Sequence, residues 1–420
     1  MTTEKRHSTE RTEPTDTTNR TETTLTIDAP KTSRPDEAIT IRITGGKPHE
    51  TIDFDATIRD CEGGKWRSHA TVTADAEGVV DLTKTAPEAG TYQGVRPMGW
   101  LWSMHPADEA QLVLPLMDVE PTTIRLRAST DTMHSERRIT RAFDETAVTR
   151  TDVETDGIVG TLVEPADPGP HPGVLVLHGS GGHLPVQRAA LLASHGFAAF
   201  ALRYSGEHER LPDEVERVSL EYFDRSAGWF RSRSTVKAGP LGIVGHSRGG
   251  EVGLLLGTRY DWVGPIVSYA GSGVLWDTPN GAPAWLDEDG EALPSVSGDG
   301  KPTLLEGQLE AADEDTREAA TIPVEELEGP VLFISGGKDP IWPARRLAEI
   351  GMERLECAAF EYPSEHLTYD DAGHFITPPY LPKVSPIFGG TAEGMAYADM
   401  DSWPTVLEYL SRGLDSDSSH

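Results

Sequence analysis

The stretch LGIVGHSRGGEVGLLLG, Leu241–Gly257, joins a short apolar run to the first turns of an expected helix through a glycine-rich turn. The turn has the pattern G-x-S-x-G, with Gly245 and Gly249 on either side of Ser247. Small residues at both positions allow a sharp strand-to-helix turn that lifts the serine hydroxyl above the edge of a sheet. Because so short a pattern also arises by chance, Ser247 is a candidate nucleophile only if the chain supplies partners for it.

The sequence from residue 146 to residue 420 alternates short apolar runs with amphipathic segments. The apolar runs include PGVLVLHGSGG, FAAFALRY, GPIVSYAG and GPVLFISGGKD. Continuous apolar strands separated by helices predict a mostly parallel, doubly wound sheet that is covered on both faces. Residues 275–326 are acidic and rich in glycine and proline, so we expect an insertion between strands that lies outside the core. Such a segment forms either a lid over the site or a surface loop.

Two later residues supply the partners that a serine nucleophile needs. Asp339 follows the strand-like run GPVLFISGG, and His374 lies in YDDAGHF, before the last expected helix. The order nucleophile, acid, histidine, with each residue after a core strand, is that of the α/β-hydrolase fold. We therefore predict an α/β-hydrolase in which His374 takes the Ser247 proton and Asp339 fixes the tautomer of His374.

Backbone amides are expected to stabilise the oxyanion that forms during such a reaction. One is the amide of Arg248, directly after the nucleophile. The second is expected from the HGSGG turn after the strand GVLVL, from Ser180 or Gly181.

Other residues are alternatives for these roles. Ser180 is a rival nucleophile, but His178 stands where the turn requires glycine. Asp370 and Asp371 are rival acids, although they precede His374 by only a few residues and are typical of loop acids. We expect His246 to pack against its neighbours without taking part in the chemistry. Each triad position also has a structural explanation, as a tight turn, a helix cap or a hydrogen-bonded histidine.

The first part of the chain has a different pattern. Residues 23–145 contain short runs such as AITIRITG, TIDFDATIRD and TTIRLRAS, in which apolar and polar residues alternate between Gly, Pro and Asp. This alternation predicts an antiparallel β-sandwich, and hence a two-domain chain. Residues 1–22 are polar and rich in threonine, which predicts a disordered tail.

Charge limits the partners of the protein. The chain carries 68 acidic and 37 basic residues, for a net charge of −31, which argues against binding to nucleic acid. Only nine of the basic residues are lysine and 28 are arginine. This composition resembles that of proteins from halophiles that accumulate salt, in which molar salt screens the repulsion between carboxylates. An ordinary acidic protein is the alternative.

The two cysteines, Cys61 and Cys357, fall in different predicted domains, so neither a disulfide framework nor a metal site is expected. We predict no cofactor. The N-terminal residues lack the apolar core of a targeting signal, and no apolar run is long enough to cross a membrane. The expectation is a cytoplasmic protein without a membrane partner.

The chain resembles the acyl-CoA thioesterase and bile acid-CoA:amino acid N-acyltransferase family along almost its whole length past the tail. The strings PMGWLWSM, at 97–104, and GHFITPPYLP, at 373–382, are its most specific matches. The resemblance also covers WRSHATVTADAEGVVDL, GVLVLHGSGG, RAALLASHGFAAFALRY and LGIVGHSRGGEVGL.

This resemblance implies an immunoglobulin-like N-terminal domain, an α/β-hydrolase domain with Ser247, Asp339 and His374 at the triad positions, and acyl-CoA as the small-molecule substrate. The amidating branch of the family has cysteine as its nucleophile, so the serine here favours hydrolysis to free fatty acid and CoA. An N-acyltransferase, an ester or dienelactone-type hydrolase, and a carrier with an inactive triad are the alternatives. The basic run Arg225, Arg231, Arg233 and Lys237 either binds CoA phosphates or is solvated surface.

Overall fold

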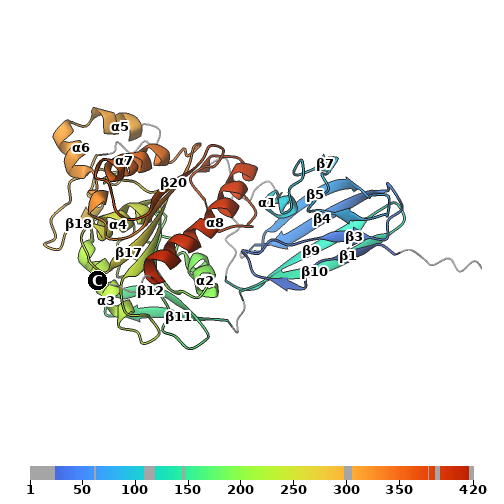
Figure 1. The fold of residues 1–420 in the computed structure, drawn as a ribbon, viewed down its shortest axis with the longest axis horizontal. Coiled ribbons are helices and arrows are strands. Elements are labelled where there is room, and N and C mark those ends of the chain that lie inside the picture. The colour runs from blue at the N-terminus through green and yellow to red at the C-terminus, as the bar shows by residue number, and fades with distance from the viewer. Residues whose placement is uncertain are drawn as a thin grey trace, which may run out of the picture.

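A computed structural model describes residues 24–60, 63–107, 119–143, 147–297, 305–376, 378–383 and 388–415. The predicted disordered tail, residues 1–22, and Cys61 lie outside the described residues. The described chain forms two lobes (Figure 1), one made of strands from its first part and one that combines a larger sheet with helices.

Short strands make up the N-terminal lobe. They are β1 (Thr26–Asp28), β2 (Thr32–Ser33), β3 (Arg42–Thr44), β4 (Thr51–Arg59), β5 (Lys65–Thr73), β6 (Val80–Asp81), β7 (Ala89–Gly90), β8 (His105–Pro106), β9 (Thr122–Ser129) and β10 (His134–Arg141). One sheet has the order β1-β3-β6 and the other β2-β10-β9-β4-β5-β7, with β8 beside β5. Apart from the parallel pair of β2 and β10, neighbouring strands are antiparallel.

The two N-terminal sheets share one apolar core. Strand β4 alternates exposed and buried residues, and its buried side chains, such as Phe54, meet Ile43 and Val80 of the other sheet in one cluster. This is the sandwich that the alternating sequence predicts. The short helix α1 (Gly99–Trp102), from the PMGWLWSM string, is completely buried and adds to the same core.

The second lobe is built on one eight-stranded sheet. Its strands are β11 (Val148–Thr155), β12 (Ile158–Pro165), β13 (Gly173–Leu177), β14 (Ala198–Arg203), β16 (Leu241–His246), β17 (Val263–Tyr269), β19 (Val331–Gly336) and β20 (Ser364–Tyr369). The order is β11-β12-β14-β13-β16-β17-β19-β20, and all pairs from β14 to β20 are parallel. The predicted mostly parallel sheet is confirmed.

Helices cover both faces of this sheet (Figure 1). They are α2 (Val186–Ser194), α3 (Leu220–Arg231), α4 (Arg248–Gly257), α7 (Ala344–Cys357) and α8 (Ala392–Asp415). Along β13, Val174 and Val176 join the apolar cluster that holds α2 and α8, whereas Leu175 and Leu177 join the cluster that holds α3, α4 and α7. Burial on both faces explains why the strand sequence GVLVL is continuously apolar.

The acidic segment 275–326 does lie between β17 and β19, but the expectation that it stays outside the core is wrong. It contains α5 (Leu305–Ala311), α6 (Glu314–Ala320) and β18 (Trp285–Leu286), which pairs with β15 (Val218–Ser219). Trp276 is 1 % and Trp285 is 2 % exposed. The expectation rested on the acidic composition of the whole segment and gave no weight to its two tryptophans. Their burial removes a large apolar area from water and holds the segment in the core.

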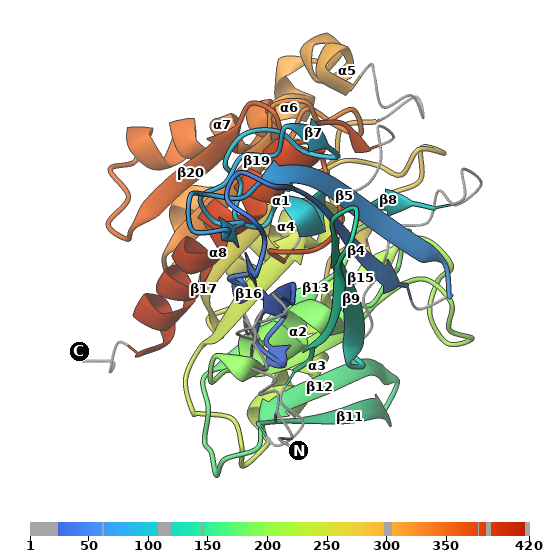
Figure 2. The ribbon, with the colours of Figure 1, turned by 90° about the vertical axis from the view of Figure 1, so that its right-hand side faces the viewer.

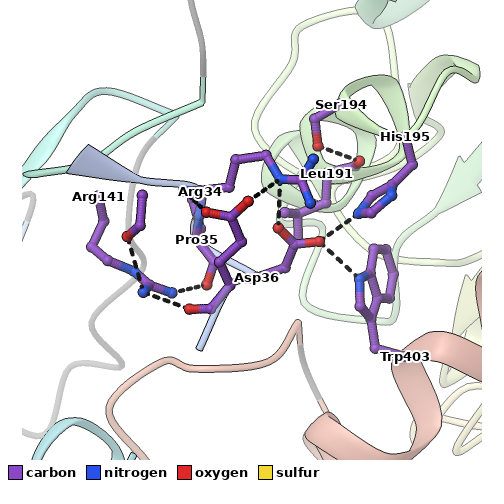
Figure 3. A network of polar contacts seen from close by, with 10 residues as sticks. Arg34, Pro35, Asp36, Arg141, Leu191, Ser194, His195 and Trp403 are labelled. Carbon is purple, nitrogen blue, oxygen red and sulfur yellow. Dashed lines mark hydrogen bonds and ion pairs between the residues drawn. The ribbon is translucent and has the colours of Figure 1, made fainter. Parts of the chain in front are cut away.

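A partly buried polar network joins the two lobes (Figure 3). The Asp36 carboxylate, from the N-terminal lobe, accepts hydrogen bonds from His195 Nε2 at 2.5 Å and Trp403 Nε1 at 3.1 Å. The Arg141 guanidinium donates to the backbone carbonyls of Pro35 and Glu37 and so holds the same segment. The α8 residue Ala396 belongs to the N-terminal apolar core. Figure 2 shows the N-terminal strands in front of the larger lobe.

Candidate active site

Ser247 occupies a strained turn between β16 and α4. Its backbone has φ 57° and ψ −120°, a conformation that a residue with a side chain adopts at a cost of roughly 1–3 kcal/mol. A Cβ atom on Gly245 would lie 2.1 Å from the carbonyl oxygen of Gly249, and one on Gly249 would lie 2.5 Å from that of Leu177. Both flanking positions therefore require glycine, as the motif predicts.

Asp339 and His374 form a buried pair at the edge of the sheet that also carries Ser247. His374 Nδ1 lies 2.7 Å from Asp339 Oδ2, and the two side chains are 4 % and 2 % exposed. The other carboxylate oxygen accepts from the amides of Ile341, at 2.8 Å, and Trp342, at 3.3 Å. These bonds fix the carboxylate, which in turn fixes the orientation of the imidazole.

The topology of the sheet places Ser247, Asp339 and His374 at the same edge of the sheet. Ser247 follows β16, Asp339 follows β19 and His374 follows β20, all at the carboxyl ends of parallel strands. Ligand sites of open α/β sheets lie at these ends. The ring of His246, which precedes the serine, is centred 5.0 Å from the His374 ring.

The HGSGG turn after β13 lies directly against the serine. A Cβ atom on Gly179 would be 3.0 Å from Ser247 Cβ, and both Ser180 and Gly181 are exposed. Arg248 is the first residue of α4, and the first amides of a helix have no partner within the helix. The two segments expected to supply oxyanion donors are thus adjacent in the structure.

The His178 ring holds the HGSGG turn in place by stacking and hydrogen bonds. Its ring stacks on Tyr204 with ring centroids 3.9 Å apart, and its Nε2 atom accepts from the Tyr204 amide at 3.3 Å. The Nδ1 atom is then the protonated one and donates to the Gly179 carbonyl at 2.7 Å. Burial lowers the pKa of His178 to about 4, which keeps the ring neutral.

The rival acids lie at the surface. Asp370 forms an ion pair with Arg345 and is 87 % exposed, and Asp371 pairs with Lys338 and is 65 % exposed. Asp339 is the carboxylate that contacts His374. The basic run begins inside α3 and continues past its end. The Arg225 guanidinium lies over the Tyr222 ring, and that of Arg233 lies over the Trp229 ring.

The Arg248 side chain makes contacts that the motif does not predict. Its guanidinium donates to the carbonyls of Trp276, at 2.7 Å, and Asp277, and to Glu251 Oε1 at 2.9 Å. Glu251 Oε1 also accepts from Trp285 Nε1 at 2.7 Å. Burial raises the pKa of Glu251, although the charge of Arg248 opposes this. Arg248, directly after Ser247, thereby anchors the acidic segment beside the candidate site.

The strand order of the sheet, with Ser247, Asp339 and His374 at the carboxyl ends of its parallel strands, defines the fold as that of an α/β-hydrolase. Sequence comparison then identifies the family. Residues 36–155 match the acyl-CoA thioester hydrolase/BAAT N-terminal region, and residues 218–416 match the BAAT/acyl-CoA thioester hydrolase C-terminal region. The chain belongs to this family of acyl-CoA thioester hydrolases and BAAT proteins.

Individual relatives match over nearly the whole chain. Acyl-coenzyme A thioesterase 1 of Mus musculus is 30% identical over 415 residues, which are 92% of this chain and 95% of the relative. The human protein of the same name is 31% identical over 406 residues, covering 90% and 94% of the two chains. A puromycin-hydrolyzing peptidase from Mycobacterium tuberculosis is similar in structure, with a TM-score of 0.46 and 15% identity, over 88% of this chain and 54% of the peptidase.

Among the described residues, none of the helices combines the length and the apolar character needed to cross a membrane.

Proposed function

We propose that this protein hydrolyses acyl-CoA thioesters through an acyl-serine intermediate. The observation that carries the proposal is the buried pair of His374 and Asp339 at the sheet edge that also presents Ser247 in a strained turn. A serine in this setting needs an adjacent base to become nucleophilic, and His374 is the available one. The family's thioesterase members supply the substrate class.

The first half of the reaction forms the acyl-enzyme. His374 Nε2 takes the hydroxyl proton of Ser247 while the serine oxygen attacks the thioester carbonyl carbon. The carbonyl oxygen becomes an oxyanion, stabilised by the amide of Arg248 and an amide of Ser180 or Gly181. The C–S bond then breaks, and the imidazolium gives its proton to the departing CoA sulfur.

The second half releases the acid. Water enters and loses a proton to His374 as its oxygen attacks the acyl-serine carbonyl. Collapse of this second tetrahedral intermediate returns the proton to the serine oxygen and frees a carboxylic acid. Asp339 stabilises the imidazolium in both halves without being protonated itself.

A fluorophosphonate probe and an acyl-CoA panel test the proposal together. The probe should label the wild type and the Ser194→Ala control but not Ser247→Ala. The same Ser247→Ala variant should lose more than about 100-fold of its CoA-releasing activity, followed with a thiol reagent, because an acting triad loses far more than that with its nucleophile. Labelling at Ser180, or p-nitrophenyl ester hydrolysis without acyl-CoA hydrolysis, would overturn the proposal.

Three further assignments remain predictions of the same proposal. The N-terminal sandwich, residues 23–145, is of the immunoglobulin-like class, and the catalytic domain spans residues 146–420. The protein is cytoplasmic. It requires no cofactor, since the chemistry above uses side chains and backbone amides alone.

A further inference from the structure

A groove of about 740 Å³ lies on the exposed face of the larger N-terminal sheet, over β4, β5, β9 and β10. It is lined by six cationic side chains and three carboxylates. The cations are Arg59, Lys65, Arg67, Arg125, Arg127 and Arg138, and the carboxylates are Asp55, Asp60 and Glu120. Three net positive charges are thus gathered in one groove of a chain whose net charge is −31.

Strand register places three of these arginines in a single row across the sheet. Arg67 on β5 pairs with Thr57 on β4, Thr57 pairs with Arg125 on β9, and Arg125 pairs with Arg138 on β10. Arg125 and Arg138 are directly opposed, and such residues have Cβ atoms about 4.5–5.5 Å apart, where like charges destabilise the sheet. Thr57 separates Arg67 from Arg125. We call Arg67, Arg125 and Arg138 the arginine row.

The neighbouring row on the same face balances its charges. There Asp55 lies between His69 and Arg127, and Glu136 lies opposite Arg127. Glu136 also reaches across to form an ion pair with Arg125. In the chain as described, neither Arg67 nor Arg138 has a carboxylate partner. Glu136 balances only Arg125 of this row, so in the described chain the arginine row keeps two cationic side chains without a carboxylate partner.

We propose that the groove binds a small ligand bearing two or more linked phosphate groups, held by the arginine row. Guanidinium groups donate paired hydrogen bonds that match phosphate oxygens, and bound phosphate would remove the repulsion within the row. The volume lies within the usual range of small-molecule sites. This site is separate from the acyl-CoA chemistry and does not depend on the proposed function.

The surroundings favour a small phosphate ligand over a polymer or a membrane. The groove lining includes Asp55, Asp60 and Glu120, which would repel a polyanion that continued beyond the row. Its described lining holds no aromatic side chain of the kind that stacks on the bases of single-stranded nucleic acid. The phosphate groups, and not a base, are thus the recognised chemistry.

Calorimetric titration with inorganic pyrophosphate tests the proposal. It is done on the whole chain, at the lowest KCl concentration at which circular dichroism shows the folded protein. The wild type should bind pyrophosphate saturably at one site, and the Arg67→Gln/Arg138→Gln variant at least tenfold more weakly. The control is Arg259→Gln, which removes one exposed arginine just after α4 and should bind like the wild type.

The melting temperature shows whether the double variant binds pyrophosphate weakly because it is unfolded. Removal of opposed like charges should leave the melting temperature of the double variant unchanged or higher. Absence of saturable pyrophosphate binding by the wild type, or equal affinity in the double variant, would refute the proposal. Tighter binding of a 12-nucleotide RNA or of phosphatidylserine vesicles than of pyrophosphate would also refute it, because the ligand would then be a polymer or a membrane.

Discussion

His246 Nε2 lies 2.9 Å from the backbone carbonyl oxygen of His374, which links the residue before the proposed nucleophile, Ser247, to the proposed base. A carbonyl oxygen only accepts, so Nε2 carries the proton. Burial, assisted by the positive charges that His374 and Arg188 can carry, holds the pKa of His246 well below its usual range. His246 is therefore a neutral donor that positions the loop of the base.

His246→Leu removes this hydrogen bond, so kcat should fall about tenfold, since a bond of this kind contributes roughly 1–1.5 kcal/mol. KM should change little, because the lost hydrogen bond joins two parts of the protein and not protein and substrate. His246→Gln, which can donate to the same carbonyl, should recover most of the loss. The limbs of the pH–rate profile should stay in place in all variants, and displaced limbs would mean that His246 itself transfers protons.

Asp339→Asn should lower kcat by roughly 10³–10⁴, because an amide no longer selects the reactive tautomer of His374 nor stabilises its imidazolium. The bond from Nδ1 of His374 to Oδ2 of Asp339 is the contact at stake. Asp370→Asn and Asp371→Asn are matched controls with side chains at the surface. If either control lost activity to the same extent as Asp339→Asn, the acid would be wrongly assigned.

The parts of this structure that were predictable from sequence are those with local patterns. Apolar strands and the glycines around Ser247 predict the sheet and its turn. Asp339 is favoured over Asp370 because it follows an earlier strand-like run, whereas Asp370 lies in a loop only a few residues before His374. The role of His246 depends on a contact with a residue 128 positions away, which no local pattern records. Likewise, the burial of Trp276 and Trp285 depends on the Arg248 and Glu251 side chains that meet them.

Asp36→Asn should destabilise the junction of the two lobes. Burial alone would raise the pKa of Asp36, but the hydrogen bond and charge of His195, with Arg34, lower it below its ordinary value. A lowered pKa adds stability above the unfolded-state pKa of about 3.9, and this stability is lost as the pH falls through the folded-state pKa.

Thermal melts at two pH values check this prediction. At pH 7 the variant should melt a few degrees below the wild type, since a hydrogen bond to a charged group contributes roughly 1.5–3 kcal/mol. The difference should shrink as the pH is lowered toward 3. Asp131→Asn, at the exposed turn between β9 and β10, should match the wild type throughout. A difference that grew on acidification would contradict the assigned sign.

Salt should stabilise the folded protein. A chain with 68 acidic and 37 basic residues repels itself in dilute buffer, and screening weakens that repulsion. The Debye length falls from about 10 Å at 0.1 M salt to about 3 Å at 1 M. The melting temperature should therefore rise between roughly 0.1 M and 3 M KCl, with most of the rise below 1 M. A melting temperature independent of KCl would contradict the halophile-like interpretation of the composition.

The acceptor of the acyl group decides whether the product is a free acid or an amide. An acyl-serine can pass its acyl group to water or to an amine such as glycine or taurine, with His374 as the base for either. Transfer to glycine or taurine needs a cationic side chain that binds the carboxylate or sulfonate of the acceptor. In the described part of the chain, Lys383 lies in the segment after His374, Arg188 and Arg141 contact that segment, and all three cations are engaged. Arg141 lies over the Tyr380 ring and donates to the carbonyls of Pro35 and Glu37. Lys383 pairs with Asp399, while Arg188 donates to the Ile376 carbonyl and lies over the Tyr269 ring.

Because these cations are buried, they are poorly placed to bind the anionic group of an acceptor. The Lys383 side chain is 5 % exposed and Arg188 is 6 % exposed, so an acceptor would have to displace existing partners. An oxoester at serine is also less reactive toward amines than a thioester at cysteine. We therefore expect free acid as the main product from medium- and long-chain acyl-CoA, even with excess glycine or taurine. Mass spectrometry of the products in high salt measures the ratio, and a majority of N-acyl amino acid would show that the enzyme is a transferase.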